Sequence, residues 1–266
     1  MTIDEAISYQ NTSAQKKTES TSRLGSYAVS SMLAGSYIGI GVVLMCAAAG
    51  PFLTSHAPAA KLVSGLVFGI ALTLVTVAGG ELLTSNMMTL TQGAHNKAIT
   101  RIAAARTMTL CFIGNLVGSA LFAGFVFLGG TFKQGSAAYA YLEYTVTSKA
   151  SSTPIEVLFK GILCNIIVCL AIWAGIRLKS EGARLTVIFW CALAFITAGF
   201  EHVVANMTTF SLALFVGVPD ITALDFASNM IFAGLGNLIG GGVIVGLGYS
   251  LLARSERKAK SFAQAA

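Results

Sequence analysis

Three polar side chains that could bind a small solute stand close together within a long apolar segment. They are Glu201, His202 and Asn206, and the apolar segment covers about residues 185–217. Ionisable groups are costly inside a membrane and mark functional sites there. An imidazole can donate a hydrogen bond to an anion and, when protonated, can also pass on a proton. We therefore take His202 as the first candidate for contact with a solute.

The composition places these side chains in a membrane protein. Of the 266 residues, 55% are hydrophobic and 11% are charged, and the mean hydropathy is +0.76. Soluble domains carry about 25% charged residues. The apolar residues fall in blocks long enough for helices of about 20 residues, the length that crosses a bilayer. The sequence thus predicts an all-α polytopic membrane protein rather than a soluble domain.

Six membrane spans are expected, between two polar ends. A cytoplasmic arm over 1–22 precedes a channel domain over 23–253, and a basic tail over 254–266 follows it. A loop of small and polar residues is expected over 129–152. The expected spans are about 26–49, 60–92, 106–128, 154–176, 185–217 and 227–252.

The basic residues predict the orientation of these spans. Lysine and arginine gather on the cytoplasmic side of membrane proteins. The net charge of +6 is therefore interpreted as a topology signal, not as a sign of nucleic-acid binding. With both termini in the cytoplasm, only Lys61, Lys133 and Lys149 would lie outside, and Lys160 would lie in the fourth span. The cytoplasmic set would be Lys16, Lys17, Arg23, Lys97, Arg101, Arg106, Arg177, Lys179, Arg184, Arg254, Arg257, Lys258 and Lys260.

The second and fifth spans are expected to be broken. In the second, Gly80 and Glu81 interrupt an apolar block, so we expect a half-helix before them, irregular backbone over 80–85, and another half-helix from Asn86. In the fifth, Gly199 precedes the polar cluster. Irregular backbone at membrane depth is tolerated where it is buried in protein or lines a cavity. Simple helix kinks are the alternative, although kinks do not explain the polar residues.

The two breaks belong to an internal repeat. Residues 78–87 resemble 198–207, and 114–118 resemble 236–240 at nearly the same displacement. The repeats cover about 26–130 and 154–252. Since each holds three spans, the second copy crosses the membrane in the opposite sense. The helix that follows each break then directs its free N–H groups toward the membrane centre, which favours an anion.

These residues resemble the formate/nitrite transporter family over nearly the whole chain. The segments that carry the resemblance are Gly80-Glu81-Leu82-Leu83-Thr84-Ser85, residues 160–173 and residues 199–207. The fourth span and the stretch that leads to Met207 look closer to the nitrite channel branch. The resemblance implies an aquaporin-like fold of inverted three-plus-three repeats, a homopentamer, and an anion pore in each protomer.

The resemblance also implies roles for individual residues. His202 would be the central pore histidine, Thr84 the threonine that faces it, and Asn165 a polar residue of the pore wall. Lys149 would pair with Glu201 in the outer vestibule. The expected constrictions are Phe68 with Leu72 on the cytoplasmic side and Leu82 with Phe195 on the outer side.

Some assignments stay open at the level of sequence. Glu81 and Glu201 could stabilise the breaks by accepting hydrogen bonds from N–H groups or by pairing with a cation. Alternatively, they could line the pore, where a carboxylate would repel an anion. Lys160 could extend its amine to the membrane surface or could concentrate anions at the vestibule. His202 could also be a structural histidine. Without the resemblance, the apolar constriction residues would be ordinary core.

The expected function is a channel for small monovalent anions, foremost nitrite, in a bacterial inner membrane. Formate or hydrosulfide is the alternative within the family. A neutral-solute channel of the aquaporin type is disfavoured because neither break carries an Asn-Pro-Ala sequence. A membrane redox enzyme would need paired intramembrane histidines for haem, and only His202 qualifies. We expect no enzymatic activity, no metal or other cofactor and no nucleic-acid partner; the expected partners are the anions, the lipid bilayer and further copies of the chain.

Overall fold

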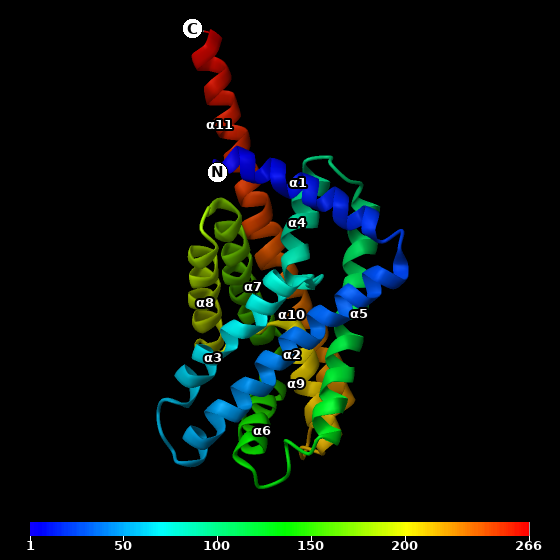
Figure 1. Cartoon of the computed structure of the whole chain (residues 1–266), viewed down its shortest axis with the longest axis vertical. Coiled ribbons are helices and arrows are strands. Elements are labelled where there is room, and N and C mark those ends of the chain that lie inside the picture. The colour runs from blue at the N-terminus through cyan, green and yellow to red at the C-terminus, as the bar shows by residue number, and fades with distance from the viewer. Residues whose placement is uncertain (266) are drawn as a thin grey trace.

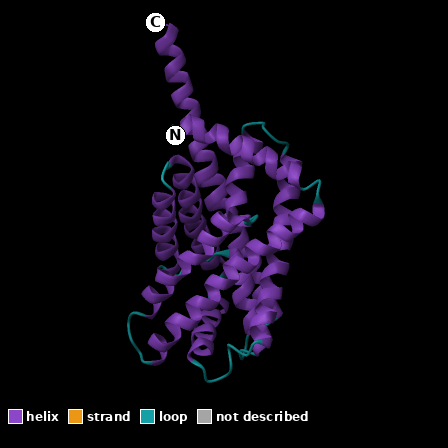
Figure 2. Cartoon of the chain, in the orientation of Figure 1, coloured by secondary structure: helices purple, strands orange, loops and turns teal. Residues whose placement is uncertain are grey.

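The computed structural model describes residues 1–265, with the side chains of residues 1–256, and this part of the chain folds into helices without a strand (Figure 2). The predicted tail residues Arg257, Lys258 and Lys260 have side chains outside the described set. The elements are α1 (Ile3–Ser20), α2 (Leu24–Thr54), α3 (Ala60–Leu74), η1 (Val75–Gly79), α4 (Leu83–His95), α5 (Arg101–Leu128), α6 (Ala137–Ala150), α7 (Pro154–Arg177), α8 (Glu181–Thr197), α9 (Val203–Val216), α10 (Ala223–Asn237), η2 (Leu238–Leu247) and α11 (Gly248–Ala265).

Five helical stretches in the described part are long and apolar enough to cross a membrane. Both termini lie at the same end of the bundle, where α1 runs across it and α11 projects beyond it, whereas α6 lies at the opposite end (Figure 1). A further apolar helix, α9, is shorter than these five stretches. The five stretches are Leu24–Thr54, Ala60–Gly79, Arg101–Leu128, Pro154–Arg177 and Ala223–Glu256.

Two interruptions separate α3 and η1 from α4, and α8 from α9. A glycine with positive φ ends the first helix of each pair, Gly79 at +85° and Gly199 at +71°. A glycine reaches this conformation without the steric cost that a Cβ brings. The backbone then extends for a few residues before the next helix begins at Leu83 or at Val203. Each second helix therefore starts well inside the bundle.

The first interruption is shorter than the irregular segment expected over 80–85. The helix α4 already begins at Leu83, so Thr84 and Ser85 lie in its first turn rather than in the break. The cause is a tertiary contact, because the side-chain oxygen of Asn115 accepts a hydrogen bond from the Leu83 N–H at 2.9 Å. The N–H groups of a first helical turn need partners from outside the helix. The sequence of the break alone does not show this partner.

The loop expected over 129–152 contains a helix. In α6 the Ser136 hydroxyl caps the first turn by accepting the Tyr139 N–H at 3.2 Å. Tyr141, Leu142 and Val146 are buried, and α6 packs against α2. The helix was not expected because the segment is rich in small and polar residues, and most of its side chains are not buried. The helix matters for the site because it carries Lys149.

The arm forms a regular helix that packs onto the bundle. Thr2 and Glu5 make a reciprocal capping box at the start of α1, an arrangement that satisfies two backbone donors. Ala6, Ile7 and Ala14 are fully or almost fully buried. The arm is thus a part of the packed structure, beyond the weak amphipathic pattern of its sequence.

Close helix packing depends on glycines that face neighbouring backbone. Gly118 of α5 meets the Met32 carbonyl of α2, and Gly240 of η2 meets the Ile162 carbonyl of α7. Small residues allow such approach between membrane helices.

We expect Gly118→Ala to lower stability by about 1–3 kcal/mol, the usual cost of overpacking. A Cβ there would overlap the Met32 carbonyl oxygen, which is backbone and cannot turn away. Gly124→Ala on the same helix is the matched control, because the nearest atom would be Phe215 at 3.8 Å. Thermal unfolding of both purified variants in one detergent measures the difference. Equal midpoints would contradict the packing argument.

Candidate functional site

The starts of the two helices that follow the interruptions meet at Thr84 and His202. The Thr84 Oγ1 lies 3.1 Å from the His202 Nε2, and both residues are buried. His202 is the N-cap of α9, and its Nδ1 accepts the Ala205 N–H at 3.2 Å. A neutral imidazole with an accepting Nδ1 carries its proton on Nε2. The cap therefore leaves an Nε2–H donor directed at Thr84, in the middle of the bundle.

The side chain of Asn165 holds the backbone of Thr84 in place. Its side-chain NH₂ donates to the Thr84 carbonyl at 3.1 Å and to the Asn237 carbonyl at 2.7 Å. It is not among the residues that line the cavity beside His202. The expected pore-wall asparagine thus contacts backbone in this structure and links α7 to α4 and to α10.

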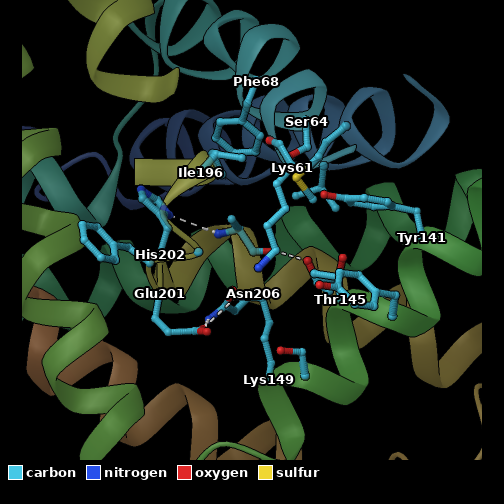
Figure 3. A pocket seen from close by; sticks show the side chains of 18 of the residues that line it. Lys61, Ser64, Phe68, Tyr141, Thr145, Lys149, Ile196, Glu201, His202 and Asn206 are labelled. Carbon is cyan, nitrogen blue, oxygen red and sulfur yellow. Dashed lines mark hydrogen bonds and ion pairs between the residues drawn. The ribbon is translucent and has the colours of Figure 1, made fainter. Parts of the chain in front are cut away.

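A cavity of about 110 Å³ opens beside His202 on the α6 side of the bundle. Figure 3 shows His202, Glu201, Asn206 and Lys149 around it, with Phe68 at its far wall. The charged residues that line it are Lys61, Lys149, Lys160 and Glu201.

Glu201 is held by its neighbours through one carboxylate oxygen. Its Oε2 accepts Lys149 Nζ at 2.9 Å, and the Glu201 side chain is 3% exposed. The same oxygen also accepts the amide NH₂ of Asn206, whose NH₂ further donates to Asn229 at 2.8 Å. Lys160 donates to the Ser152 hydroxyl at 3.2 Å. The Glu201 charge is therefore neutralised, and the surplus of lysines leaves the mouth of this cavity positive.

Glu81 has the corresponding contacts at the other interruption. Its Oε2 accepts Lys17 Nζ at 2.7 Å and the Asn86 NH₂ at 2.9 Å. Both side chains of the Glu81 pair are 20% exposed, so this pair is wetter than that of Glu201. The cation comes from α1, which sequence reasoning did not connect with Glu81.

Two further asparagines were missed as site residues. Asn115 accepts the Leu83 N–H and donates to the Ser31 and Glu81 carbonyls, at 2.7 and 2.8 Å. Asn237 accepts the Val203 N–H at 2.9 Å and donates to the Gly161 and Glu201 carbonyls, each at 2.8 Å. Each clamps the extended backbone of one interruption. Their shared sequence, Gly-Asn-Leu followed by an aliphatic residue and Gly, was the available signal.

The apolar residues are arranged differently from the expected constrictions. Phe68 and Phe195, expected on opposite sides, are in edge contact with ring centroids 5.8 Å apart. The Phe195 ring also stacks on His202 at 5.9 Å. Phe68 lines the cavity that holds Lys149, on the side away from α1. This contact differs from the expected grouping, which paired Phe68 with Leu72 and Phe195 with Leu82.

The fold and the site define a helical membrane protein with a buried polar centre between two interrupted helices. Within the described residues, no group of three or more His, Cys, Asp or Glu side chains is arranged to hold a metal ion. Comparison with known proteins gives the family. The formate/nitrite transporter family model matches residues 5–251, and the chain belongs to this family.

Individual relatives agree with this assignment. The nitrite transporter NirC of Escherichia coli is 36% identical over 228 residues, which is 83% of this chain and 81% of the relative. A solved FNT family ion channel matches with a TM-score of 0.88 and 35% identity, over 93% of this chain and 98% of the other. A pentameric formate channel with formate bound matches with a TM-score of 0.75 and 27% identity, over 87% and 98%. The family resemblance of the sequence is thereby confirmed.

Proposed function

We propose that this chain conducts small monovalent anions across a bacterial inner membrane, with nitrite as its main substrate and formate as the runner-up; hydrosulfide is the remaining candidate. The observation that carries the proposal is the buried Thr84–His202 pair between the two helix interruptions. The similarity to NirC favours nitrite, and the similarity to a formate channel supports formate as the alternative.

The proposed architecture is six spans in two inverted repeats. In this arrangement α3, η1 and α4 form one broken span, and α8 and α9 form the other. The channel domain covers 23–253, with the arm 1–22 and the tail 254–266 in the cytoplasm. The common end of both termini in Figure 1 is consistent with this orientation. A homopentamer with a pore in each protomer is proposed by analogy with the pentameric formate channel.

In the proposed path an anion first meets the positive mouth that contains Lys149 and Lys160. Partly dehydrated, it passes the contact of Phe68 with Phe195. Apolar constrictions hold back hydrated ions. It then accepts a hydrogen bond from the His202 Nε2–H, the donor that otherwise faces Thr84.

The remaining predicted residues have supporting roles. Leu72 lies one helical turn beyond Phe68, and we assign it with Leu82 to a second constriction on the α1 side. Asn165 positions Thr84, and Asn206 positions Glu201. Gly80, Glu81 and Gly199 form the interruptions. Since Lys149 neutralises Glu201, the carboxylate serves to anchor the break rather than to repel the solute.

Flux into proteoliposomes tests the proposal. Vesicles that contain the purified protein are expected to take up nitrite, and formate, far faster than empty vesicles, whereas a bulkier anion such as gluconate should be excluded. The rates for nitrite, formate and hydrosulfide in one preparation rank the substrates. Equal rates in protein-containing and empty vesicles would refute the function.

The variant His202→Asn is expected to change the ratio of nitrite to formate flux by about tenfold or more, since a hydrogen bond to a charged group contributes about 1.5–3 kcal/mol. Any pH dependence that arises from the imidazole should disappear as well. Thr84→Ser is the matched control, because it keeps the hydroxyl that faces His202. Unchanged selectivity and an unchanged pH profile in His202→Asn would exclude the role of the imidazole.

A further inference from the structure

A basic recess lies at the turn between α4 and α5, at the end of the bundle that carries both termini (Figure 1). Its volume is about 440 Å³. Residues 94–101 other than Asn96 line it, and this lining set includes Lys97 and Arg101 but no aspartate or glutamate. Arg101 begins α5, which is long and apolar enough to cross a membrane. The recess therefore places positive charge where a membrane helix meets water.

Three cations gather at this recess without a carboxylate to balance them. Lys97 and Arg101 line it. Arg254 of α11 is close as well, since burial, together with the charges of Arg254 and Arg101, lowers the pKa of His95 in the recess wall. None of the three cations makes an ion pair within the part of the chain that the structure describes. A cluster of like charges without counterions attracts an anionic partner.

Lys97 occupies a position at which glycine would be more stable. It follows Asn96, the C-cap of α4, and its φ is +62°. The next N–H group, that of Ala98, donates to the Gly93 carbonyl at 2.8 Å. In this way of ending a helix the left-handed residue is usually glycine, because a Cβ raises the free energy of that conformation. The lysine thus destabilises the turn, and its ammonium group can offset this cost by binding an anion.

The apolar neighbour of the recess favours a lipid over a free anion. Ile102 follows Arg101 directly and is 82% exposed. It opens the apolar stretch of α5 that is long enough to cross a membrane. An exposed isoleucine at the end of such a helix faces the boundary between headgroups and acyl chains. The surface therefore offers cations to a headgroup and, directly beside them, an apolar contact to its chains.

We propose that this recess binds the headgroup phosphate of an anionic phospholipid, with Lys97 and Arg101 as its ligands and Ile102 against the acyl chains. Arg254 adds attraction from α11. Basic residues at the ends of membrane helices attract anionic lipids. A bound lipid stabilises the folded protein, since a ligand favours the state that binds it. The inference requires that the chain lies in a membrane, but it does not depend on which anion the channel conducts.

Thermal unfolding of the full-length protein in mixed micelles tests the site. We expect the midpoint to rise as phosphatidylglycerol is added to the detergent, relative to the same amount of zwitterionic phosphatidylcholine. The variant Arg101→Gln should need about fivefold more phosphatidylglycerol for the half-maximal rise, as expected for the loss of one basic residue near an anionic lipid.

The variant Lys97→Gly separates lipid binding from folding, because its two expected effects have opposite signs. In phosphatidylcholine alone its midpoint should exceed that of the original protein by about 2 °C, since glycine adopts the left-handed conformation without strain. Its response to phosphatidylglycerol should nevertheless weaken as it does in Arg101→Gln. A loss of response in a variant that is more stable to begin with cannot arise from damage to the fold.

Lys179→Gln is the matched control. Lys179 is an exposed lysine in the turn between α7 and α8 and does not line the recess. A response to phosphatidylglycerol that Lys97→Gly and Arg101→Gln weaken, and that Lys179→Gln keeps, supports the site. No response in the original protein, or equal responses in all four proteins, overturns it.

Soluble glycerol 3-phosphate at matched ionic strength distinguishes a lipid from a free phosphate. It carries the phosphate of the headgroup without acyl chains, so we expect it to raise the midpoint far less than phosphatidylglycerol does. An equal rise with glycerol 3-phosphate, lost in Lys97→Gly, would overturn the assignment to a lipid.

Discussion

Replacement of Lys149 by methionine is expected to destabilise the protein by about 3–5 kcal/mol, the usual cost of leaving one partner of a buried ion pair alone. Glu201 would keep its contact with Asn206 but lose the only cation within ion-pair distance among the described residues. Thermal unfolding in detergent measures the loss of stability. Nitrite flux should fall as well, since a carboxylate without its counterion repels anions at the mouth of the path.

The double variant Lys149→Met with Glu201→Gln should recover most of this stability. A glutamine oxygen can still accept the Asn206 NH₂, and no charge remains buried. Lys17→Met provides the matched control, because its pair with Glu81 is 20% exposed on both sides. We expect a loss between that of an exposed pair, about 0–1 kcal/mol, and that of a buried pair, because the Lys17–Glu81 pair is only partly exposed. A double variant as unstable as Lys149→Met would contradict burial of charge as the cause.

Replacement of Asn237 by leucine should destabilise the second interruption by several kcal/mol. The Val203 N–H and the Gly161 and Glu201 carbonyls would lose their side-chain partner. Each buried polar group left without a partner costs about 1–3 kcal/mol. Because the first turn of α9 positions His202, anion selectivity should degrade together with stability.

Asn229→Leu on the same helix is the comparison for Asn237→Leu. Asn229 is also buried, but among the described residues its side chain makes hydrogen bonds only to the side chains of Asn206 and Glu201. It should therefore cost less stability. If the two leucine variants unfold at the same temperature, the hydrogen bonds of Asn237 to the backbone contribute no more to stability than the side-chain hydrogen bonds of Asn229. Asn115→Leu should match Asn237→Leu, because it occupies the same role at the first interruption.

The contacts of the two interruptions differ in one important respect. Asn115 and Asn237 clamp them alike, and both glutamates bind a lysine and an asparagine. The ion pair of Glu201 with Lys149, beside His202, is less exposed than the ion pair of Glu81 with Lys17. His202 itself matches Leu82 in the repeat, so the imidazole has no counterpart. The residues that the two interruptions share therefore stabilise the interrupted backbone. His202, which has no counterpart, is the residue that we assign to the solute.

The sequence was sufficient to predict the features that depend on residues close together in the chain. Hydropathy predicted the apolar helices, since a membrane span is recognised by its length and composition alone. The glycine and glutamate clusters predicted helix interruptions at the positions where helices end in this structure. The family was recognised from segments that lie close together in the chain.

The tertiary structure decided what depends on distant partners. The start of α4 at Leu83 requires Asn115 from another helix, and the partner of Glu81 comes from the arm. The grouping of Phe68 with Phe195 follows from the packing of α3 against α8. Such contacts join residues far apart in the chain, and periodicity carries no information about them. The sequence by itself therefore supplied the candidate residues for anion contact. The packing of the helices decided which of these residues meet, because a hydrogen bond depends on position in space and not on separation along the chain.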